Sequence, residues 1–252
     1  MSNKSAIEWT EHTWNPITGC SKVSPGCDHC YAENMARRLR AMGTKGYENG
    51  FELKLMRERL DQPLRRKTPT KYFVNSMSDL FHEEVPFAFI EQIISVIDKT
   101  PQHAYQILTK RAERMAEFFH NRKPPANAWI GVTVENVKHG LPRIDHLRQI
   151  DATIRFISAE PLLEDLGKVD LSNIHWCIVG GESGNQARPL KEEWVQEIQK
   201  QCEQQKVAFF FKQWGTWGAD GIKRSKKHNG RKLKGRVWDE MPNFPETSQI
   251  SY

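Results

Sequence analysis

The sequence lacks the features that would place the chain in a membrane, in a secretory pathway or in a dinucleotide-binding fold. None of its apolar runs, in 252 residues, approaches the roughly 20 residues that a membrane-spanning helix needs. The N-terminal stretch MSNKSAIEWTEHTWNP has no apolar signal-peptide core. No glycine fingerprint follows the first strand-like segment, and no internal repeat stands out. We therefore expect a cytoplasmic protein without a membrane partner.

Cysteine is scarce, and the count of five is odd, which disfavours a disulfide framework. In a reducing compartment, clustered cysteines are more often metal ligands or catalysts than disulfides. Acidic residues are also fewer than basic ones, 31 against 37, which gives a net charge of +6. A positive excess points weakly to an acidic partner such as nucleic acid.

From residue 71 onward, short β-rich runs alternate with helical ones. The predicted strands cover residues 71–77, 104–110, 128–134, 153–161, 174–182 and 207–214, with one more near 7–14. Such alternation is typical of a parallel α/β sheet, and nearly continuous apolar strands indicate that both of its faces are covered. Six or seven units of this kind predict a partial or complete (βα) barrel, or a doubly wound open sheet.

Polar residues follow the apolar part of each predicted strand, and this favours the barrel. They are Asn75, Ser76, Asp79, Thr109, Lys110, Thr133, Glu135, Asn136, Ser158, Glu160, Glu182, Ser183, Lys212 and Gln213. In a barrel, these strand ends converge on one mouth, where active sites lie. Capping of the following helices is the alternative explanation for some of the Ser and Asp residues.

The alternation of side chains within one strand gives a second indication. In WIGVTVE, Gly131, Thr133 and Glu135 share one face of the strand. Ile130, Val132 and Val134 share the other. The aliphatic face suits covering helices, and the small and polar face suits a barrel interior near its mouth.

Three of the five cysteines, Cys20, Cys27 and Cys30, lie within eleven residues, with the spacing C-x6-C-x2-C. A structural zinc site uses four protein ligands, usually in two pairs, and the second pair is missing here. His12 or His29 could supply a fourth ligand, so zinc remains an alternative. The other two cysteines, at positions 177 and 202, fall in the middle of a strand and of a helix and are typical of small buried apolar residues.

A [4Fe–4S] cluster held by three cysteines explains the missing fourth ligand differently. Its fourth iron is left free to bind the amino and carboxylate groups of S-adenosylmethionine (SAM). One electron then cleaves a C–S bond and generates a 5'-deoxyadenosyl radical. Radical chemistry of this kind belongs to the cofactor, while the protein supplies geometry and excludes solvent.

At these residues the sequence resembles the radical SAM superfamily, whose usual motif is C-x3-C-x2-C; the first gap is longer here. The segments CYA (30–32), NSMSDLF (75–81), ILTKR (107–111) and IGVTVEN (130–136) resemble the spore photoproduct lyase branch of that superfamily. More closely, residues 14–242 resemble a largely uncharacterised phage and bacterial family with a three-cysteine motif. The matching pieces are WNPITGCSKVSPGCDHCYA, ILTKR, ISAEPLL, CIVGGESG, FFFKQWG and GRVWDEMP.

The resemblance implies a (βα) barrel of the radical SAM type over residues 1–214, in which residues 14–32 (the cysteine loop) bind the cluster. Residues 215–252 are expected to form a basic C-terminal extension packed on the barrel. A radical SAM enzyme also needs an electron donor such as flavodoxin or ferredoxin. The candidate residues for SAM or substrate are Ser76, Ser78, Asp79, Lys110, Thr133, Glu135, Glu160 and Glu182.

The C-terminal extension contains eight basic residues in fourteen positions, with no acidic residue among them. They are Lys223, Arg224, Lys226, Lys227, Arg231, Lys232, Lys234 and Arg236 (the basic strip). This pattern is typical either of a solvated loop or of a phosphate-binding surface. Trp214, Trp217 and Trp238 flank it and could stack on bases or belong to the core.

Three hypotheses follow. The first is a radical SAM enzyme that acts on a nucleic acid base or nucleotide. The second is a zinc-stabilised nucleic-acid-binding protein without redox chemistry. The third is a radical enzyme for a small molecule, whose basic strip binds a partner protein.

Overall fold

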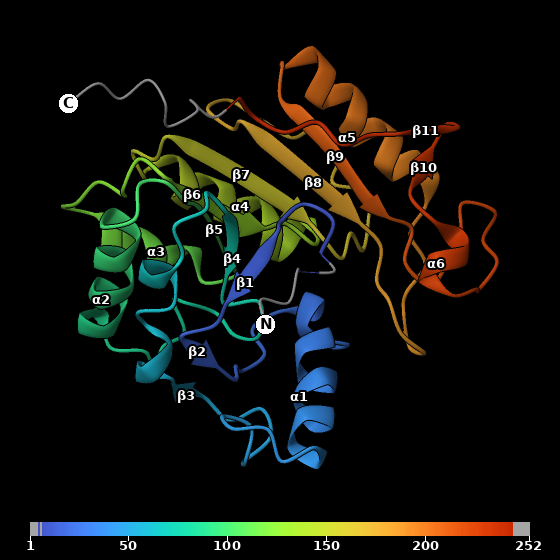
Figure 1. The fold of residues 1–252 in the computed structure, drawn as a ribbon. Coiled ribbons are helices and arrows are strands. Elements are labelled where there is room, and N and C mark those ends of the chain that lie inside the picture. The colour runs from blue at the N-terminus through green and yellow to red at the C-terminus, as the bar shows by residue number, and fades with distance from the viewer. Residues whose placement is uncertain (1–4, 6, 244–252) are drawn as a thin grey trace.

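The computed structural model describes residue 5 and residues 7–243, and a parallel sheet is its central feature (Figure 1). Seven strands lie in chain order: β1 (His12–Trp14), β4 (Lys71–Val74), β5 (Ala104–Thr109), β6 (Ala128–Thr133), β7 (Ile154–Ala159), β8 (Trp176–Gly180) and β9 (Ala208–Gln213). Every neighbouring pair is parallel. Because the strand order never reverses, the doubly wound alternative is wrong.

The sheet curves into a partial barrel (Figure 1). Strands β1 and β9 are its two ends and do not pair with each other, so within the described residues the barrel stays open. The prediction of an α/β partial barrel is confirmed, and the complete barrel is not formed.

Four helices cover the outer face of the sheet. They are α2 (Phe87–Asp98), α3 (Ala112–Phe119), α4 (Val137–Arg148) and α5 (Glu192–Gln204). Their apolar residues share one core with Ile130, Val132 and Val134 of β6 and its continuation. Cys177 and Cys202 belong to the same core and are 0% exposed, as expected for buried apolar residues.

Aromatic side chains fill the inner face. Trp9, Trp129, Phe156 and Trp176 form a second buried cluster, in which the Trp176 ring centroid lies 6.0 Å from that of Trp9 and 5.9 Å from that of Trp129. A Cβ atom on Gly131 would lie 2.5 Å from the Phe156 ring, so this position faces inward, as the alternation in β6 predicts. The barrel floor is therefore packed, and a site must lie at the mouth.

All seven strands of the sheet are shorter than the predicted segments, β4 and β1 among them. The strand expected over 71–77 ends at Val74, because Asn75 adopts a left-handed φ of 60° and turns the chain. Its backbone N–H donates to Trp14 O at 2.8 Å, which joins the end of β4 to the end of β1. The strand expected near 7–14 covers only His12–Trp14.

The helix α1 (Tyr31–Ala41), which follows the cysteine loop, lies apart from the sheet (Figure 1). Its buried residues Ala32 and Ala36 pack against Tyr47 and Met77.

Residues after β9 run back along the outer edge of that strand. The N–H of Phe211 donates to Trp238 O at 2.9 Å, and the N–H of Glu240 donates to Phe209 O at 3.2 Å. Between them lie α6 (Lys226–Asn229) and the short hairpin of β10 (Lys232–Leu233) and β11 (Arg236–Val237). In the described part of the chain, no helix combines the length and apolar character needed to cross a membrane.

Candidate cluster-binding site

The cysteine loop begins at the carboxyl end of β1. Its first segment, β2 (Ile17–Thr18), pairs antiparallel with β3 (Lys54–Leu55). Gly19 follows with a φ of +80°, and a Cβ atom there would lie 2.0 Å from Glu52 O, so only glycine fits. The N–H of Cys20 donates to Phe51 O at 3.1 Å. The backbone beside the first cysteine is therefore fixed before any ligand binds.

The second half of the loop is equally ordered. A 3₁₀ turn at Pro25–Cys27 brings the N–H of Cys27 to within 2.9 Å of Ser24 O. Cys30 is the residue that caps the start of α1. All five cysteines of the chain are free thiols, and the three in the loop are partly exposed.

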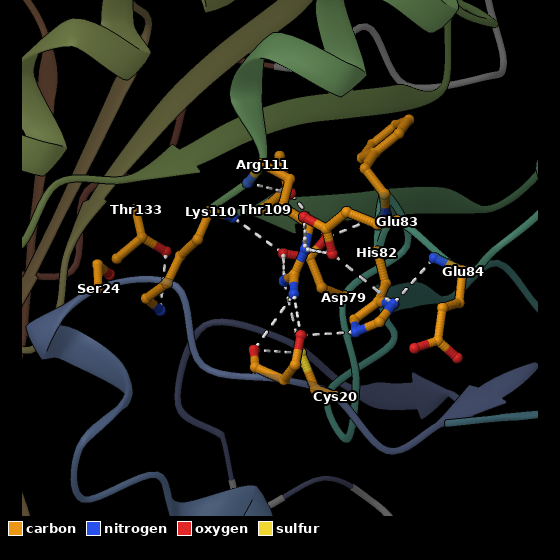
Figure 2. Close-up of polar contacts among 12 residues, drawn as sticks. Cys20, Ser24, Asp79, His82, Glu83, Glu84, Thr109, Lys110, Arg111 and Thr133 are labelled. Atoms are coloured by element: carbon orange, nitrogen blue, oxygen red, sulfur yellow. Dashed lines mark hydrogen bonds and ion pairs between the residues drawn. The ribbon is translucent and has the colours of Figure 1, made fainter. Parts of the chain in front are cut away.

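A buried arginine joins the start of the loop to the sheet (Figure 2). Arg111 follows β5 and is 7% exposed. Its Nη1 lies 3.5 Å from the Sγ atom of Cys20 and 3.2 Å from Oδ2 of Asp79. Its Nη2 donates to the carbonyl and hydroxyl oxygens of Ser21 at 3.2 and 2.9 Å. Its Nε lies 2.9 Å from both carboxylate oxygens of Glu83.

Asp79, a predicted ligand residue, is largely occupied by this network. Its carboxylate also accepts from Thr109 Oγ1 at 2.7 Å and from the backbone N–H groups of Phe81 and Lys110 at 3.0 Å each. Burial raises the pKa of the Cys20 thiol to about 11, and the Asp79 carboxylate adds to the rise while Arg111 opposes it.

A second buried pair holds the middle of the loop. Glu135 is 0% exposed and accepts a hydrogen bond from the Ser24 hydroxyl. Nη1 of Arg143, on α4, lies 2.5 Å from Glu135 Oε2 and donates to Thr133 O at 2.8 Å. Burial opposes ionisation of Glu135, but the hydrogen bond and charge of Arg143 outweigh it and lower the pKa of this carboxyl.

A third contact holds the end of the loop. Nδ1 of His29 lies 3.1 Å from Oε2 of Glu182, at the carboxyl end of β8. Arg188 pairs with the same carboxylate at 2.7 Å and donates from Nη2 to Pro25 O at 2.8 Å. Although burial opposes it, hydrogen bonding from Arg188 lowers the pKa of Glu182. The loop thus spans the mouth from β4 and β5, across β6, to β8.

The remaining predicted residues lie at the same edge with different contacts. Ser76 donates to Asn15 Oδ1 at 3.2 Å, and Ser78 donates to Ile17 O at 2.9 Å, so both hold the approach to the loop. Nζ of Lys110 lies 3.5 Å from Thr133 Oγ1. Glu160 pairs with Nζ of Lys212 at 2.7 and 3.0 Å.

Sequence reasoning missed the three arginines, and it placed Lys212 at a strand end without pairing it with Glu160. Arg111 stands beside Lys110 in the quoted segment ILTKR, and Arg188 comes six residues after Glu182. Neither position carries a motif that predicts its partner. Arg143 lies on a helix and contacts the mouth through the buried Glu135 and the backbone carbonyl of Thr133.

The donor set can be tested against a cluster. No three Cys, His, Asp or Glu side chains of the described residues converge closely enough to hold a single metal ion. A four-iron cluster binds each cysteine to a different iron atom, so its three thiolates need not meet at one point. Three partly exposed thiols on one ordered loop, with a guanidinium beside one of them, fit such an anionic group.

The basic strip is partly neutralised by neighbouring groups. Arg224 pairs with Asp220 at 2.7 Å, and Lys226 pairs with Glu8 at 3.0 Å. Arg231 donates to backbone oxygens of Phe211 and Trp238. Among the described residues, no ion pair involves the exposed members Lys227, Lys232 and Lys234.

The aromatic residues near the strip divide into two kinds. Trp214 is 2% exposed and donates from its indole to Lys232 O at 2.9 Å, so it belongs to the core. Trp238 is half-buried, and the Arg236 guanidinium lies 3.5 Å from its ring centroid. Lys223 donates to Asn185 O and lies 5.9 Å from the Trp217 ring centroid.

Comparison with known proteins identifies the family. The family described as "Protein of unknown function (DUF5131)" matches residues 4–242, and the chain belongs to it. None of the curated proteins matches the chain.

Three solved structures of spore photoproduct lyase are similar in outline. The lyase complexed with dinucleoside spore photoproduct has 13% identity and a TM-score of 0.44 over 80% of this chain. A single mutant of the lyase has 14% identity and a TM-score of 0.45 over 72%. A double mutant with bound AdoMet and dinucleoside spore photoproduct has 12% identity and a TM-score of 0.44 over 80%. The matches span 58% to 63% of the lyase chains.

Proposed function

We propose that this member of the DUF5131 family is a radical SAM enzyme, in which Cys20, Cys27 and Cys30 hold a [4Fe–4S] cluster. One observation carries the proposal. Three free thiols lie on a single loop, and buried charged residues bind that loop at three points of the barrel mouth. Buried ion pairs of this kind are costly to build and are weak contributors to stability, so a role in fixing the loop explains them better.

When bound, such a cluster would supply the single electron for cleavage of a C–S bond of SAM, and the chemistry gained would be hydrogen-atom abstraction by a 5'-deoxyadenosyl radical. The chain's part is to bind, orient and exclude water. Asp79 holds the loop through Arg111, Glu135 holds it directly through Ser24, and Glu182 holds it through His29 and Arg188. Ser76 and Ser78 support its approach.

Residues with remaining capacity at the mouth are the proposed contacts of SAM and substrate. Lys110 is partly exposed, and its ammonium has a single 3.5 Å contact to Thr133 among the described residues, so it can bind the SAM carboxylate. Glu160 and Lys212 face each other as an ion pair in which the side chains are 17% and 14% exposed. A donor beside an acceptor suits the hydroxyl, carbonyl and amine groups of ribose or of a base.

The test is anaerobic. The protein is reconstituted with iron and sulfide, reduced with dithionite and given SAM, and 5'-deoxyadenosine is measured by mass spectrometry. We expect about four irons per chain and deoxyadenosine from the wild type, and neither from Cys27→Ala, Cys30→Ala. Lys110→Gln is expected to keep its iron and lose most deoxyadenosine. A colourless protein that keeps stoichiometric zinc and leaves SAM intact would instead support the zinc-stabilised binding module.

A nucleic acid base or nucleotide is the proposed substrate, because exposed cations and a half-buried tryptophan lie together on the extension. We expect the triple change Lys227→Gln, Lys232→Gln, Lys234→Gln to weaken DNA or RNA binding and to reduce the slope of log K against log salt by about 2 to 3. A matched control replaces three exposed lysines on other elements, Lys99, Lys123 and Lys200. Equal binding by both triple variants would favour a small-molecule substrate and a protein partner for the strip.

The proposed setting is the cytoplasm, where free thiols persist, with a one-electron donor such as flavodoxin or ferredoxin. The surface beside the cysteines supports a protein partner. Tyr31 and Met35 are 56% and 42% exposed on α1, next to Arg38. An acidic donor should reduce the protein faster at low salt than at high salt, and a salt-independent rate would contradict docking here.

A further inference from the structure

We propose that Arg111 is a positioning residue that sets the reduction potential of the cluster, through its hydrogen bond to the Cys20 sulfur and its fixed positive charge. This inference rests on the proposed function, because it concerns the same three cysteines. It assigns a task to a residue that the sequence motif does not mark.

The guanidinium cannot swing away from the sulfur, because every donor nitrogen is engaged (Figure 2). Nε faces Glu83, Nη1 faces Asp79 and Cys20, and Nη2 faces Ser21. A planar fork with this many partners has one orientation. The 3.5 Å distance from Nη1 to Sγ is thus a fixed property of the site.

Ser21 is itself locked in place by a buried histidine. His82 is 3% exposed, and its Nε2 lies 2.8 Å from the Ser21 hydroxyl. The backbone N–H of Glu84 donates to Nδ1 of His82 at 3.2 Å, so the ring proton resides on Nε2 and points at Ser21. The buried His82 side chain therefore fixes Ser21, and Ser21 in turn fixes Arg111.

The three sulfurs differ in this respect. Cys20 has a charged donor, whereas within the described residues no side chain donates to the sulfur of Cys27 or Cys30. Hydrogen bonds to ligand sulfurs and nearby charge are the main protein terms that set a cluster's potential. Reduction adds one negative charge, so a cation at this sulfur favours the reduced state and raises the potential.

The carboxylate of Glu83 partly neutralises the positive charge of Arg111, so its removal should have the opposite effect to removal of Arg111. The Glu83 side chain is 60% exposed and pairs with Nε, the side of the guanidinium away from the sulfur contact. Removing its negative charge leaves Arg111 in place and less compensated. The two substitutions Arg111→Gln and Glu83→Gln are therefore expected to move the potential in opposite directions.

The experiment is a redox titration of the reconstituted full-length protein, followed by the EPR signal of the reduced cluster. Arg111→Gln should lower the ratio of reduced to oxidised cluster about tenfold at a given ambient potential, which is about 59 mV for one electron. Arg111→Lys keeps the positive charge but lacks the planar guanidinium, so its reduction potential should lie between those of the wild type and Arg111→Gln. Glu83→Gln should raise the ratio about threefold. Glu91→Gln, which removes an exposed carboxylate paired with Arg122 at 2.7 Å, is the matched control and should leave it unchanged.

The outcomes separate the two proposals. Equal potentials in the wild type, Arg111→Gln and Glu83→Gln, with full iron in each, would overturn the role of Arg111 and leave the radical SAM proposal standing. A wild type that forms no iron–sulfur cluster would overturn both. If Arg111→Gln loses its iron, Glu83→Gln decides: a raised potential supports the inference, and an unchanged one rejects it.

Discussion

Arg111 and Arg143 are two buried arginines at the same mouth, and they act on the cysteine loop in different ways. Each is less than a tenth exposed, and each pairs with a buried carboxylate that follows a strand. Arg111 reaches past Asp79 to the loop and to a cysteine sulfur. Among the described residues, Arg143 contacts Glu135 and Thr133 and is linked to the loop only through Glu135, which accepts a hydrogen bond from Ser24. A buried arginine–carboxylate pair can thus affect the reduction potential of a cluster, as proposed for Arg111 and Asp79. A second pair, Arg143 and Glu135, affects only the position of the loop.

The largest effect is expected from Arg143→Met. It leaves the carboxylate of Glu135, at 0% exposure, without its cation, and breaking a buried pair in this way costs about 3 to 5 kcal/mol. Urea unfolding followed by tryptophan fluorescence measures the loss. Lys123→Met, which breaks an exposed pair with Asp151, is the control and should cost at most about 1 kcal/mol. Similar losses in the two variants would contradict the importance of burial.

Arg188→Met should have an intermediate effect. Arg188 is partly exposed, but its partner Glu182 is buried and, among the described residues, would keep only His29 and the backbone N–H of residue 188 as partners. Leaving a buried carboxylate and the carbonyl of Pro25 short of donors costs about 1 to 3 kcal/mol. The reconstituted variant should lose iron to a chelator faster than the wild type. If iron is retained as long as in the wild type, this anchor does not hold the loop.

Ser24→Ala tests whether the position of the loop can be changed without changing the reduction potential of the cluster. It removes one hydrogen bond to Glu135, which should cost about 1 kcal/mol and speed the loss of iron. Because Ser24 contacts no cysteine sulfur among the described residues, the reduction potential should stay at the wild-type value. A shift as large as that of Arg111→Gln would show that position and potential are not separable here.

The smallest effect is the pH dependence of the Glu135 pair. Arg143 lowers the pKa of Glu135 below the value of about 4.3 in an unfolded chain. Its stabilisation is therefore complete well above that value and is lost as the pH falls through it towards the lower pKa of the folded state. The difference in unfolding free energy between the wild type and Glu135→Gln should shrink between pH 6 and pH 4 on this basis. A difference that grows on acidification would contradict the sign.

The sequence predicted most of the sheet because its strands are aliphatic runs with a fixed alternation. The inward face of Gly131 and the burial of Cys177 follow from that alternation alone. The residue at which β4 ends was not predictable from the alternation, because the left-handed turn at Asn75 depends on its hydrogen bond to Trp14 of β1.

The site was predictable only in part. The spacing of the three cysteines marks them as candidate ligands in the sequence. The residues that hold their loop in place, however, come from distant parts of the chain. Arg111 lies 91 residues from Cys20, Glu135 lies 111 from Ser24, and Glu182 lies 153 from His29. Arginines and carboxylates are common on any surface, so no local pattern tells which of them a fold will bring together and bury.

The most direct test of the central claim is EPR spectroscopy of the reduced, reconstituted protein before and after addition of SAM. A cluster held by three cysteines has one iron open to a ligand, so we predict a [4Fe–4S]⁺ signal whose g-values change when SAM is added. Cys27→Ala, Cys30→Ala should give no such signal. A signal that SAM leaves unchanged, or the absence of any cluster in the wild type, would contradict the assignment of this mouth to SAM chemistry.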